Sequence, residues 1–409
     1  MKEYFKVTEL NQVIEHTSDF RIADRETVSI NTASGRILAE TIVSDTDLPD
    51  FTRSTMDGFA VCASSTFGAS AGSPSLLLIK GSVAMGASPE FSIQAGEAAR
   101  IATGGMLPEG ADSVVMIEFT EAIDDDAIEV FKSVAPGQNI IEKGEDFQKG
   151  KTVLTEGIEI RPAEVGLMAA FGVSQVNVYK KPVIGIISTG DEIVPVSHTP
   201  PQGHIRDINS YSLSALVRNA GGSPKTYGII KDDYKALKRV CEKALEETDM
   251  VLISGGSSVG TRDFTVDVLS SFPDASILVH GISISPGKPT ILASVSGQPV
   301  WGLPGHVVSA MVVFDIVVNP FISKMSGVKN FNRNMFRQDA VLTRNLSSAQ
   351  GREEYIRVKL FEKDDIVFAE PVLGKSGMIN TMVYADGLIR IPLNTEGLDK
   401  GASVKVMLI

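Results

Sequence analysis

The chain has 409 residues, more than one hydrophobic core normally organises, so we expect two to four domains. Hydrophobic residues make up 43% of it and charged residues 22%, a globular composition with no segment resembling a disordered tail. The net charge of −12 argues against a broad surface for nucleic acid or anionic membrane, because such surfaces need clustered Lys and Arg.

Targeting and metal signals are weak along the whole chain. The N-terminus has no apolar run behind a basic start, so no secretory signal is expected. The most apolar stretch, Ala310 to Val318, is interrupted by Asp315 and is well short of the roughly 20 residues that span a bilayer. We therefore expect a cytoplasmic protein without membrane association. Cys62 and Cys241 form no C-x-x-C pair and no His has ligand spacing, so any metal would be bound by oxygen.

The N-terminal part is predicted to be discontinuous. Residues 1–46 and 140–180 each contain a helical pattern, and the second helix opens at Arg161-Pro162 and stops at Gly172. We expect these pieces to form one elongated domain into which residues 47–139 are inserted. The inserted segment is β-rich, with Gly, Pro and Ser between its strands. Its expected strands include Ser75–Ile79, Ser113–Phe119 and Ala127–Val134.

Residues 181–328 alternate strand and helix patterns, which predicts a mostly parallel sheet covered on both faces. Val183–Ile187 and Met250–Ile253 have the continuous apolar character of buried parallel strands. Asn209 or Ser210 is expected to cap the helix between them, and Gly221-Gly222 to end it. The other expected elements are strands at Thr226–Ile230, Ser276–Ile284, Thr290–Val295 and Pro299–Leu303, and helices at Tyr234–Thr248, from about Asp263, and at Val307–Val318.

Residues 329–409 are predicted to form a C-terminal β domain. Its expected strands are Tyr355–Leu360, Ile366–Val372, Gly387–Pro392 and Ser403–Ile409. The fold class is therefore multidomain α/β plus β. A central α/β domain with a mostly parallel sheet accompanies a β-rich inserted domain, a helical, elongated N-terminal domain and a C-terminal β-barrel-like domain.

A Gly/Ser-rich loop, Ser254 to Gly260, joins a predicted strand to a predicted helix. Glycine lets the backbone approach a ligand, and successive N–H groups in such a loop can point at an anion. The loop matches neither a P-loop nor a dinucleotide-binding fingerprint. Phosphate binding and an ordinary tight turn are both open readings of this loop taken alone.

Acidic residues gather at the same predicted edge of the sheet. Thr189 to Glu192 leaves the carboxyl end of a strand, where open α/β sheets place their ligand crevice. Asp263, and either Asp232 or Asp233, should reach this edge too. Carboxylates from several loops favour a hard cation such as Mg²⁺ that bridges to phosphate. The alternative is that these acids are solvated or cap helices.

Four further segments combine polar groups suited to anions. Lys288 stands in the stiff turn Pro286–Thr290, and the amides of Gly302–His306 can form a second anion nest. In the β-rich segment, Arg53–Phe59 and Arg100–Gly105 carry cations, hydroxyls and a carboxylate. Each is an ordinary turn if taken alone, so their co-occurrence is the informative feature.

That co-occurrence carries a resemblance. The segments are, in order, PDFTRSTMDGFAV, RIATGGMLPEGADSVV, KGEDFQKG, STGDEIV, DINSYSLSALV, SGGSSVGTRDF, SPGKPT, GLPGHVVSA and GKSGMINTMVYADGLIRIP. Together they resemble the molybdopterin molybdenumtransferase family, called MoeA in bacteria and gephyrin E domain in animals, over essentially all 409 residues.

The resemblance implies an activity and an assembly. Members take adenylyl-molybdopterin and molybdate, cleave the phosphoanhydride with a divalent cation, and release AMP and molybdenum cofactor. It also implies a homodimer of elongated four-domain subunits, with the cleft between the α/β domain of one subunit and the β-rich domain of the other. Contacts with molybdopterin adenylyltransferase and with cofactor-accepting enzymes are expected partners.

Site residues follow from the matched motifs and the residue-level reading together. The expected catalytic residues are Asp57, Thr103, Asp146, Glu192 and Asp263, of which Glu192 and Asp263 would ligate Mg²⁺. The expected binding residues are Thr189, Gly190, Asp191, Asp232, Ser254, Gly255, Gly256, Ser257, Ser258, Gly260, Lys288, Pro304, Gly305 and His306.

Three positions depart from the family pattern. The family often has Arg where Ile141 stands, Lys where Ser285 stands, and Asn-Pro where His306-Val307 stands. Two cations suited to an oxyanion are therefore missing, although a protonated His306 could compensate. These departures leave open a molybdopterin-binding paralogue that prefers tungstate or lacks turnover. A molybdopterin adenylyltransferase is a further alternative, against which the flanking domains argue, and a scaffold role would need an appended domain.

Overall fold

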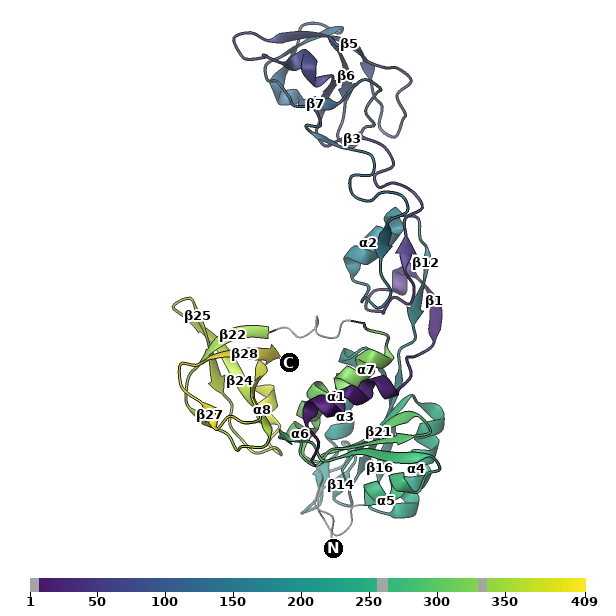
Figure 1. Ribbon diagram of the computed structural model, residues 1–409, viewed down its shortest axis with the longest axis vertical. Helices are drawn as coiled ribbons and strands as arrows, with labels where there is room; N and C mark the ends of the chain where they lie inside the picture. Colours follow the sequence, from purple (N-terminus) through teal and green to yellow (C-terminus); the bar gives the residue numbers. More distant parts are fainter. Residues whose placement is uncertain (1–6, 256–263, 330–336) are drawn as a thin grey trace. The chain divides into compact units, whose positions relative to one another are not determined.

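The computed structural model describes residues 7–255, 264–329 and 337–409 (Figure 1). Contacts between residues divide the chain into two compact units. The first unit comprises Met1–Glu40, Glu156–Arg161 and Gln175–Ile409, and the second Thr41–Thr155 and Pro162–Ser174. The finer four-domain boundaries given above stay a prediction.

The second unit is built on one mixed sheet with the order β7-β4-β6-β5-β9-β8. Strand β4 lies between β6 and β7 and is antiparallel to both, while β5 runs parallel to β6. Apolar residues pack on both faces, Phe59 and Val115 on one and Ala60 and Val114 on the other. The strands are β4 Gly58–Val61, β5 Ser75–Ser82, β6 Glu97–Ile101, β7 Ser113–Met116, β8 Thr120–Ala122 and β9 Ala127–Val130.

Short elements complete this unit. Strand β3 (Arg53–Ser54) pairs with β10 (Ile140–Ile141), and β2 (Ile42–Val43) pairs with β11 (Thr152–Leu154). Helix α2 covers Pro162–Ala170. It is followed by Gly172 at φ 72, a left-handed conformation that glycine adopts without steric cost, so the predicted stop is confirmed.

The first unit begins with little helix. Helix α1 covers Leu10–Glu15 and continues as the 3-10 helix η1, His16–Asp19, so the predicted N-terminal helical stretch is short. Strand β1 (Arg25–Ser29) pairs antiparallel with β12 (Gln175–Tyr179). This ribbon joins two segments that are separated in sequence by the whole of the inserted unit.

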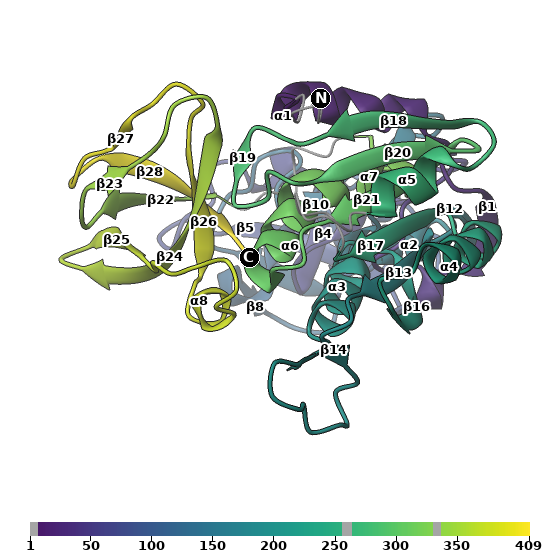
Figure 2. The ribbon, with the colours of Figure 1, turned by 90° about the horizontal axis from the view of Figure 1, so that it is seen from below.

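The main sheet of the first unit has the order β16-β13-β17-β21-β20-β18, which can be followed in Figure 2. The first four strands are parallel, and β20 and β18 are antiparallel to their neighbours, so the sheet is mostly parallel as predicted. The strands are β13 Val183–Thr189, β16 Ser223–Ile230, β17 Met250–Ser254, β18 Ala275–His280, β20 Ile291–Val295 and β21 Gln298–Leu303. The short strands β14 (Ile193–Val194) and β15 (Ile205–Arg206) pair beside it.

Helices cover both faces of this sheet. Because successive side chains point to opposite faces, Met250 and Leu252 pack under one helical layer and Val251 and Ile253 under the other. The first layer contains helix α3 (Asn209–Asn219) and the helical run that begins at Val307, and the second contains α4 (Tyr234–Glu247) and α5 (Phe264–Ser270). Each fully buried aliphatic side chain contributes about 1.5–3 kcal/mol.

Two elements differ from the prediction. The expected strand Ser276–Ile284 is wrong in extent, because β18 ends at His280 and a separate strand, β19 (Ile284–Ser285), pairs with β24 (Glu353–Lys363) in the C-terminal part of the chain. The expected helix Val307–Val318 continues through Met325. It is made of α6 (Val307–Val313), the π-helix η5 (Phe314–Val318) and α7 (Asn319–Met325).

The helical run Val307–Met325 is long and apolar enough, by length and composition, to cross a membrane. In the structure, 78% of its most apolar window is buried within the protein. Phe321 packs edge-on against Trp301 of the central sheet, with ring centroids 4.9 Å apart. The run therefore serves as a core helix of this unit.

The C-terminal segment forms a closed barrel. Five strands follow the order β24-β25-β22-β28-β26, and β26 pairs back with β24. Val358, Ile389 and Val406 fill its interior. The predicted barrel-like domain is confirmed. Its strands are β22 Arg337–Leu342, β24 Glu353–Lys363, β25 Ile366–Pro371, β26 Gly387–Ile391 and β28 Ser403–Leu408, with helix α8 at Asn380–Val383 and a short pair, β23 Leu346–Ser347 and β27 Gly397–Leu398.

Candidate functional site

Three parallel strands end side by side at one edge of the main sheet. In the register, Ser188 of β13 lies opposite Ser254 of β17, and Ser254 lies opposite Leu303 of β21. The segments that follow these strands therefore start next to one another, as the sequence predicted. They contain Thr189–Glu192, Ser254-Gly255 and Pro304–His306.

The backbones of these segments approach closely. Gly255 has φ 107, and a Cβ placed on it would lie 2.3 Å from the carbonyl oxygen of Thr189. A Cβ on Gly305 would lie 3.7 Å from the Cα of Gly255. Glycine is needed at position 255 for its positive φ and because a side chain would not fit. The absence of a side chain also lets a ligand approach the backbone, as an anion site made of backbone groups requires.

Asn209 links two of these segments by hydrogen bonds. Its Nδ2 donates to Ser254 Oγ over 2.7 Å and to the carbonyl oxygen of Gly305 over 2.9 Å. The prediction that Asn209 or Ser210 caps α3 is wrong, because the N-cap position is Ile208 and makes no side-chain cap bond. Asp207 instead accepts a bond from the backbone N–H of Ser210, over 3.1 Å.

Three polar atoms at this edge are buried without a hydrogen-bond partner in the described part of the chain. They are Thr189 Oγ1, Asn209 Oδ1 and Ser210 Oγ. Their residues are only 4%, 8% and 7% exposed. Buried polar groups are nearly always hydrogen-bonded, so a group of unpaired ones indicates where a polar ligand would bind. Sequence reasoning missed Asn209 and Ser210 as site residues, although the polar run DINSYS was the available signal.

Acidic side chains border the same edge. A Cβ on Gly190 would lie 2.8 Å from Glu192 Oε2, so the Glu192 carboxylate folds back over the glycine. Asp191 Oδ1 accepts from the backbone N–H of Asp232 over 3.3 Å, which joins the loops after β13 and β16. Asp233 is the cap of α4, since its Oδ1 accepts from the N–H of Ala236 over 2.8 Å. Among residues 7–255, 264–329 and 337–409, no cluster of three or more His, Cys, Asp or Glu could hold a metal.

Basic residues reach this edge from the antiparallel side. Ile291 at the start of β20 lies opposite Gly302 near the end of β21, so the turn carrying Lys288 stands at the carboxyl edge. Lys288 is exposed there. His306 Nδ1 lies 2.8 Å from Ser376 Oγ of the barrel domain, and the carbonyl oxygen of Ser376 accepts from the N–H of Val308 over 3.0 Å. The barrel thus contacts the site loop directly.

Five of the expected site residues lie outside the described residues. They are Gly256, Ser257, Ser258, Gly260 and Asp263.

In the other unit, Asp57 and Thr103 are brought together. Asp57 Oδ1 accepts from the backbone N–H of Thr103 over 2.7 Å and from its hydroxyl over 2.9 Å. These two bonds, the backbone one more strongly, hold the pKa of the Asp57 carboxyl below its usual value. The loop that carries Asp57 leads directly into strand β4 at Gly58. A Cβ on Gly58 would lie 1.9 Å from the carbonyl oxygen of Val115, so only glycine fits at this position.

The segment carrying Asp146 borders the same loops. Lys143 donates its backbone N–H to Thr52 Oγ1 over 3.1 Å, and Asp146 donates its own to the carbonyl oxygen of Leu48, also over 3.1 Å. The carboxylate of Asp146 is exposed. The structure therefore groups the segments around Arg53, Thr103 and Asp146 within one unit, although they are far apart in sequence.

Comparisons with known proteins agree with this arrangement. Family profiles match residues 6–172, described as "MoeA N-terminal region (domain I and II)", residues 185–324, described as "Probable molybdopterin binding domain", and residues 339–409, described as "MoeA C-terminal region (domain IV)". The molybdopterin molybdenumtransferase of Bacillus subtilis is 33% identical over 390 residues, which cover 94% of this chain and 90% of the relative.

Solved structures give the same result. A molybdopterin biosynthesis MoeA protein from Pyrococcus horikoshii is 38% identical, with a TM-score of 0.80 and coverage of 98% of this chain and 99% of the other. A second structure of a MoeA protein from that organism is 32% identical, with a TM-score of 0.85 and coverage of 99% and 100%. The chain therefore belongs to the MoeA family, a family of transferases of molybdenum cofactor biosynthesis.

Proposed function

We propose that this protein inserts molybdate into adenylyl-molybdopterin, with cleavage of the phosphoanhydride and release of AMP and molybdenum cofactor. The observation that carries the proposal is the set of unpaired buried atoms at the carboxyl edge, Thr189 Oγ1, Asn209 Oδ1 and Ser210 Oγ. They lie where β13, β17 and β21 end, and where Gly255 lets the backbone come within reach of a ligand. A polar substrate with phosphates would satisfy them.

The chain's own residues would bind and orient the anhydride. The backbone N–H of Gly305 would donate to phosphate oxygens, and the exposed ammonium group of Lys288 would add a positive charge at the same edge. Asn209 would fix the relative position of the loops after β17 and β21 through its bonds to Ser254 and Gly305. Donors held in place before the reaction stabilise charge that develops on the leaving phosphate.

Magnesium is part of this proposal. Glu192 and Asp263 would hold it, and the carboxylate of Glu192 already faces the site loop over Gly190. Oxygen donors in small number suit Mg²⁺, which usually keeps several waters and is completed by substrate phosphates. When bound, the ion neutralises charge on the anhydride.

Two of the departures from the family pattern have charged neighbours. Ile141 lies opposite Arg53 in the β3–β10 pair, and Arg53 is exposed. Ser285 lies opposite Glu354, which accepts a 2.9 Å bond from Arg352 Nε. Arg53 would therefore replace the cation missing at position 141, which supports oxyanion binding there, whereas the charge of Arg352 is balanced by Glu354.

We further propose a cytoplasmic homodimer that passes its product to cofactor-accepting enzymes and receives substrate from molybdopterin adenylyltransferase. Light scattering tests the dimer. A mass of one chain, 43.7 kDa, would contradict it.

The activity is tested by incubating purified protein with adenylyl-molybdopterin, Mg²⁺ and either molybdate or tungstate, and measuring AMP. Oxyanion-dependent AMP release supports the proposal, and a tungstate preference would select the paralogue with altered oxyanion choice. No release above buffer would overturn it. In a separate incubation with molybdopterin and ATP, formation of adenylyl-molybdopterin would indicate the adenylyltransferase instead. Asp57→Asn should slow release strongly, while Asp125→Asn on an exposed turn is the matched control.

A further inference from the structure

A cavity of about 430 Å³ lies at the opposite, amino edge of the main sheet. It is bordered by Lys181, just before β13, and by Asn219 and Gly221, just before β16. Since Val183 and Ser223 are neighbours in the register, these residues stand at the starts of two adjacent parallel strands. The Thr189–Glu192 and Ser254 segments leave the other ends of strands in the same sheet, so the two sites are separate.

The cavity is strongly basic in an acidic chain. Four cations line it, and one carboxylate, that of Glu159, opposes them. The whole chain carries a net charge of −12, so a positive lining runs against its overall charge. The four cations are Arg36, Lys180, Lys181 and Arg218.

Most of this positive charge is available to a ligand. Lys180, Lys181 and Arg218 are exposed and make no ion pair in the described part of the chain. Arg36 pairs with Glu26 and donates from Nη2 to the carbonyl oxygen of Tyr179 over 2.8 Å. These contacts fix the Arg36 side chain in the wall of the cavity, and Glu26 balances part of its positive charge.

Two polar atoms of the wall are buried and unpaired. Arg36 Nε and Ser326 Oγ have no hydrogen-bond partner among the described residues. Ser326 is only 8% exposed, and it contributes to the cavity together with Asn319 and Ser323 of α7. Both atoms lie beside cations that also lack an ion-pair partner within the described ranges. A cluster of charges with a purely structural role would pair these groups, so their arrangement indicates a ligand site.

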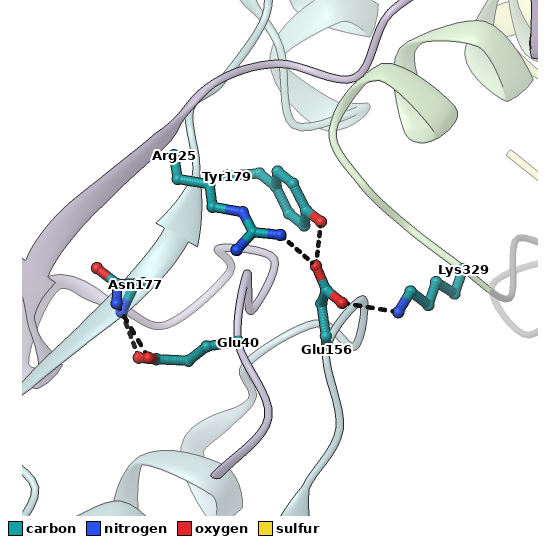
Figure 3. Close-up of polar contacts among 6 residues, drawn as sticks. All are labelled: Arg25, Glu40, Glu156, Asn177, Tyr179 and Lys329. Atoms are coloured by element: carbon teal, nitrogen blue, oxygen red, sulfur yellow. Dashed lines mark hydrogen bonds and ion pairs between the residues drawn. The ribbon is translucent and has the colours of Figure 1, made fainter.

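A network of hydrogen bonds keeps this wall in place, as Figure 3 shows. The Glu156 carboxylate accepts from Arg25 over 2.8 Å, from the Tyr179 hydroxyl over 2.5 Å and from Lys329 over 2.9 Å. These bonds hold the pKa of Glu156 below its usual value, most through Tyr179. Tyr179 itself lines the cavity, so the network positions one side of it before any ligand arrives.

We propose that this basic cavity binds a small phosphate-bearing anion. Its volume lies in the range of small-molecule sites, about 300–1,000 Å³. Guanidinium and ammonium groups with a hydroxyl and amides are the donors that recognise phosphate oxygens. The site goes beyond the proposed molybdenum transfer, because it lies at the other edge of the sheet and shares no residue with the transfer site.

Calorimetric titration of the full chain with inorganic pyrophosphate tests the proposal. The paired variant Lys181→Glu/Arg218→Glu should weaken binding by at least about tenfold, since it reverses two of the cations. The matched control Lys235→Glu/Arg239→Glu makes the same change on exposed positions of α4 and should bind as the unchanged protein does. Thermal unfolding of both variants checks that each is folded.

Two further variants keep the outcome decisive. Ser326→Ala should weaken binding about 2- to 10-fold, by loss of one hydroxyl donor. Lys235→Ala, a single change at an exposed position of α4, should leave it unchanged. Pyrophosphate binding of unchanged affinity in Lys181→Glu/Arg218→Glu would overturn the proposal, as would the absence of saturable binding. Oxyanion-dependent AMP release is measured separately on the unchanged protein, so either result is distinguishable from a failure of the proposed transfer.

Discussion

Thr103 donates two hydrogen bonds to a single carboxylate oxygen of Asp57, one from its backbone N–H and one from its hydroxyl. Both bonds stabilise the charged carboxylate and lower its pKa. Replacing Thr103 with Val removes the hydroxyl and keeps the backbone bond, so the pKa of Asp57 should rise. An NMR titration of the Asp57 carboxyl measures this pKa. The control is Thr120→Val, because the Thr120 hydroxyl donates to the carbonyl oxygen of Ile117. Equal Asp57 pKa values in both variants would refute the assignment.

The close approach at Gly255 predicts a large loss of stability on adding one methyl group. Gly255→Ala combines a positive φ with a Cβ 2.3 Å from the Thr189 carbonyl oxygen, and should cost roughly 3 kcal/mol or more. Gly297 also has a positive φ, 78, but a Cβ there would meet nothing within 4 Å, so Gly297→Ala should cost about 1 kcal/mol. Urea unfolding of both variants compares them. Equal losses would mean that the contact with Thr189 is relieved by a small backbone shift.

Loss of the Asn209 amide should weaken both stability and activity. Asn209→Ala leaves Ser254 Oγ and the Gly305 carbonyl without this donor, which should cost about 1–3 kcal/mol of unfolding free energy. AMP release should fall as well, because the two loops lose their common bond. Asn394→Ala, on an exposed turn, should change stability by less than about 0.5 kcal/mol. A fully active, fully stable Asn209→Ala protein would remove Asn209 from the site.

Burial raises the pKa of Asp315, in the helical run Val307–Met325, to about 7. Its carboxyl therefore stays protonated in the folded state at a pH where the unfolded chain has released the proton. The free energy of unfolding should fall by roughly 3–4 kcal/mol as pH rises from about 4 to about 7, and then level off. Asp315→Asn should remove that fall, and Asp399→Asn, on an exposed turn, should keep it. Urea unfolding at pH 5 and pH 8 distinguishes the two.

The central strands were predictable because burial on both faces leaves a continuous apolar pattern. Val183–Ile187 and Met250–Ile253 carry that pattern, and both lie inside the parallel sheet. Strand β19 was not predictable, since Ile284 and Ser285 alone carry no pattern and pair with a strand that follows about 70 positions later in the printed sequence. Only the closed barrel provides them with a partner.

The site was predictable as a set of loops but not as a set of contacts. Parallel strands bring their carboxyl ends to one edge, so Thr189, Ser254 and Pro304 could be grouped from the sequence. Asn209 could not, because its two partners lie 45 and 96 positions away and its local pattern resembles a helix start. The basic cavity combines residues from positions 35 to 328 that no local pattern connects.

The discontinuous first unit has a consequence for how the protein is made. Residues 41–155 supply most of the second unit in one uninterrupted piece, so that unit can fold soon after it leaves the ribosome. The segment before it cannot form its native pairings at that stage. Strand β1 pairs with β12 only after Tyr179 is synthesised, and Thr8 forms its bridge to Ile282 later. During translation the segment around β1 therefore lacks these native partners. Apolar side chains such as Val13 and Phe20 stay exposed until the sheet that buries them has been synthesised.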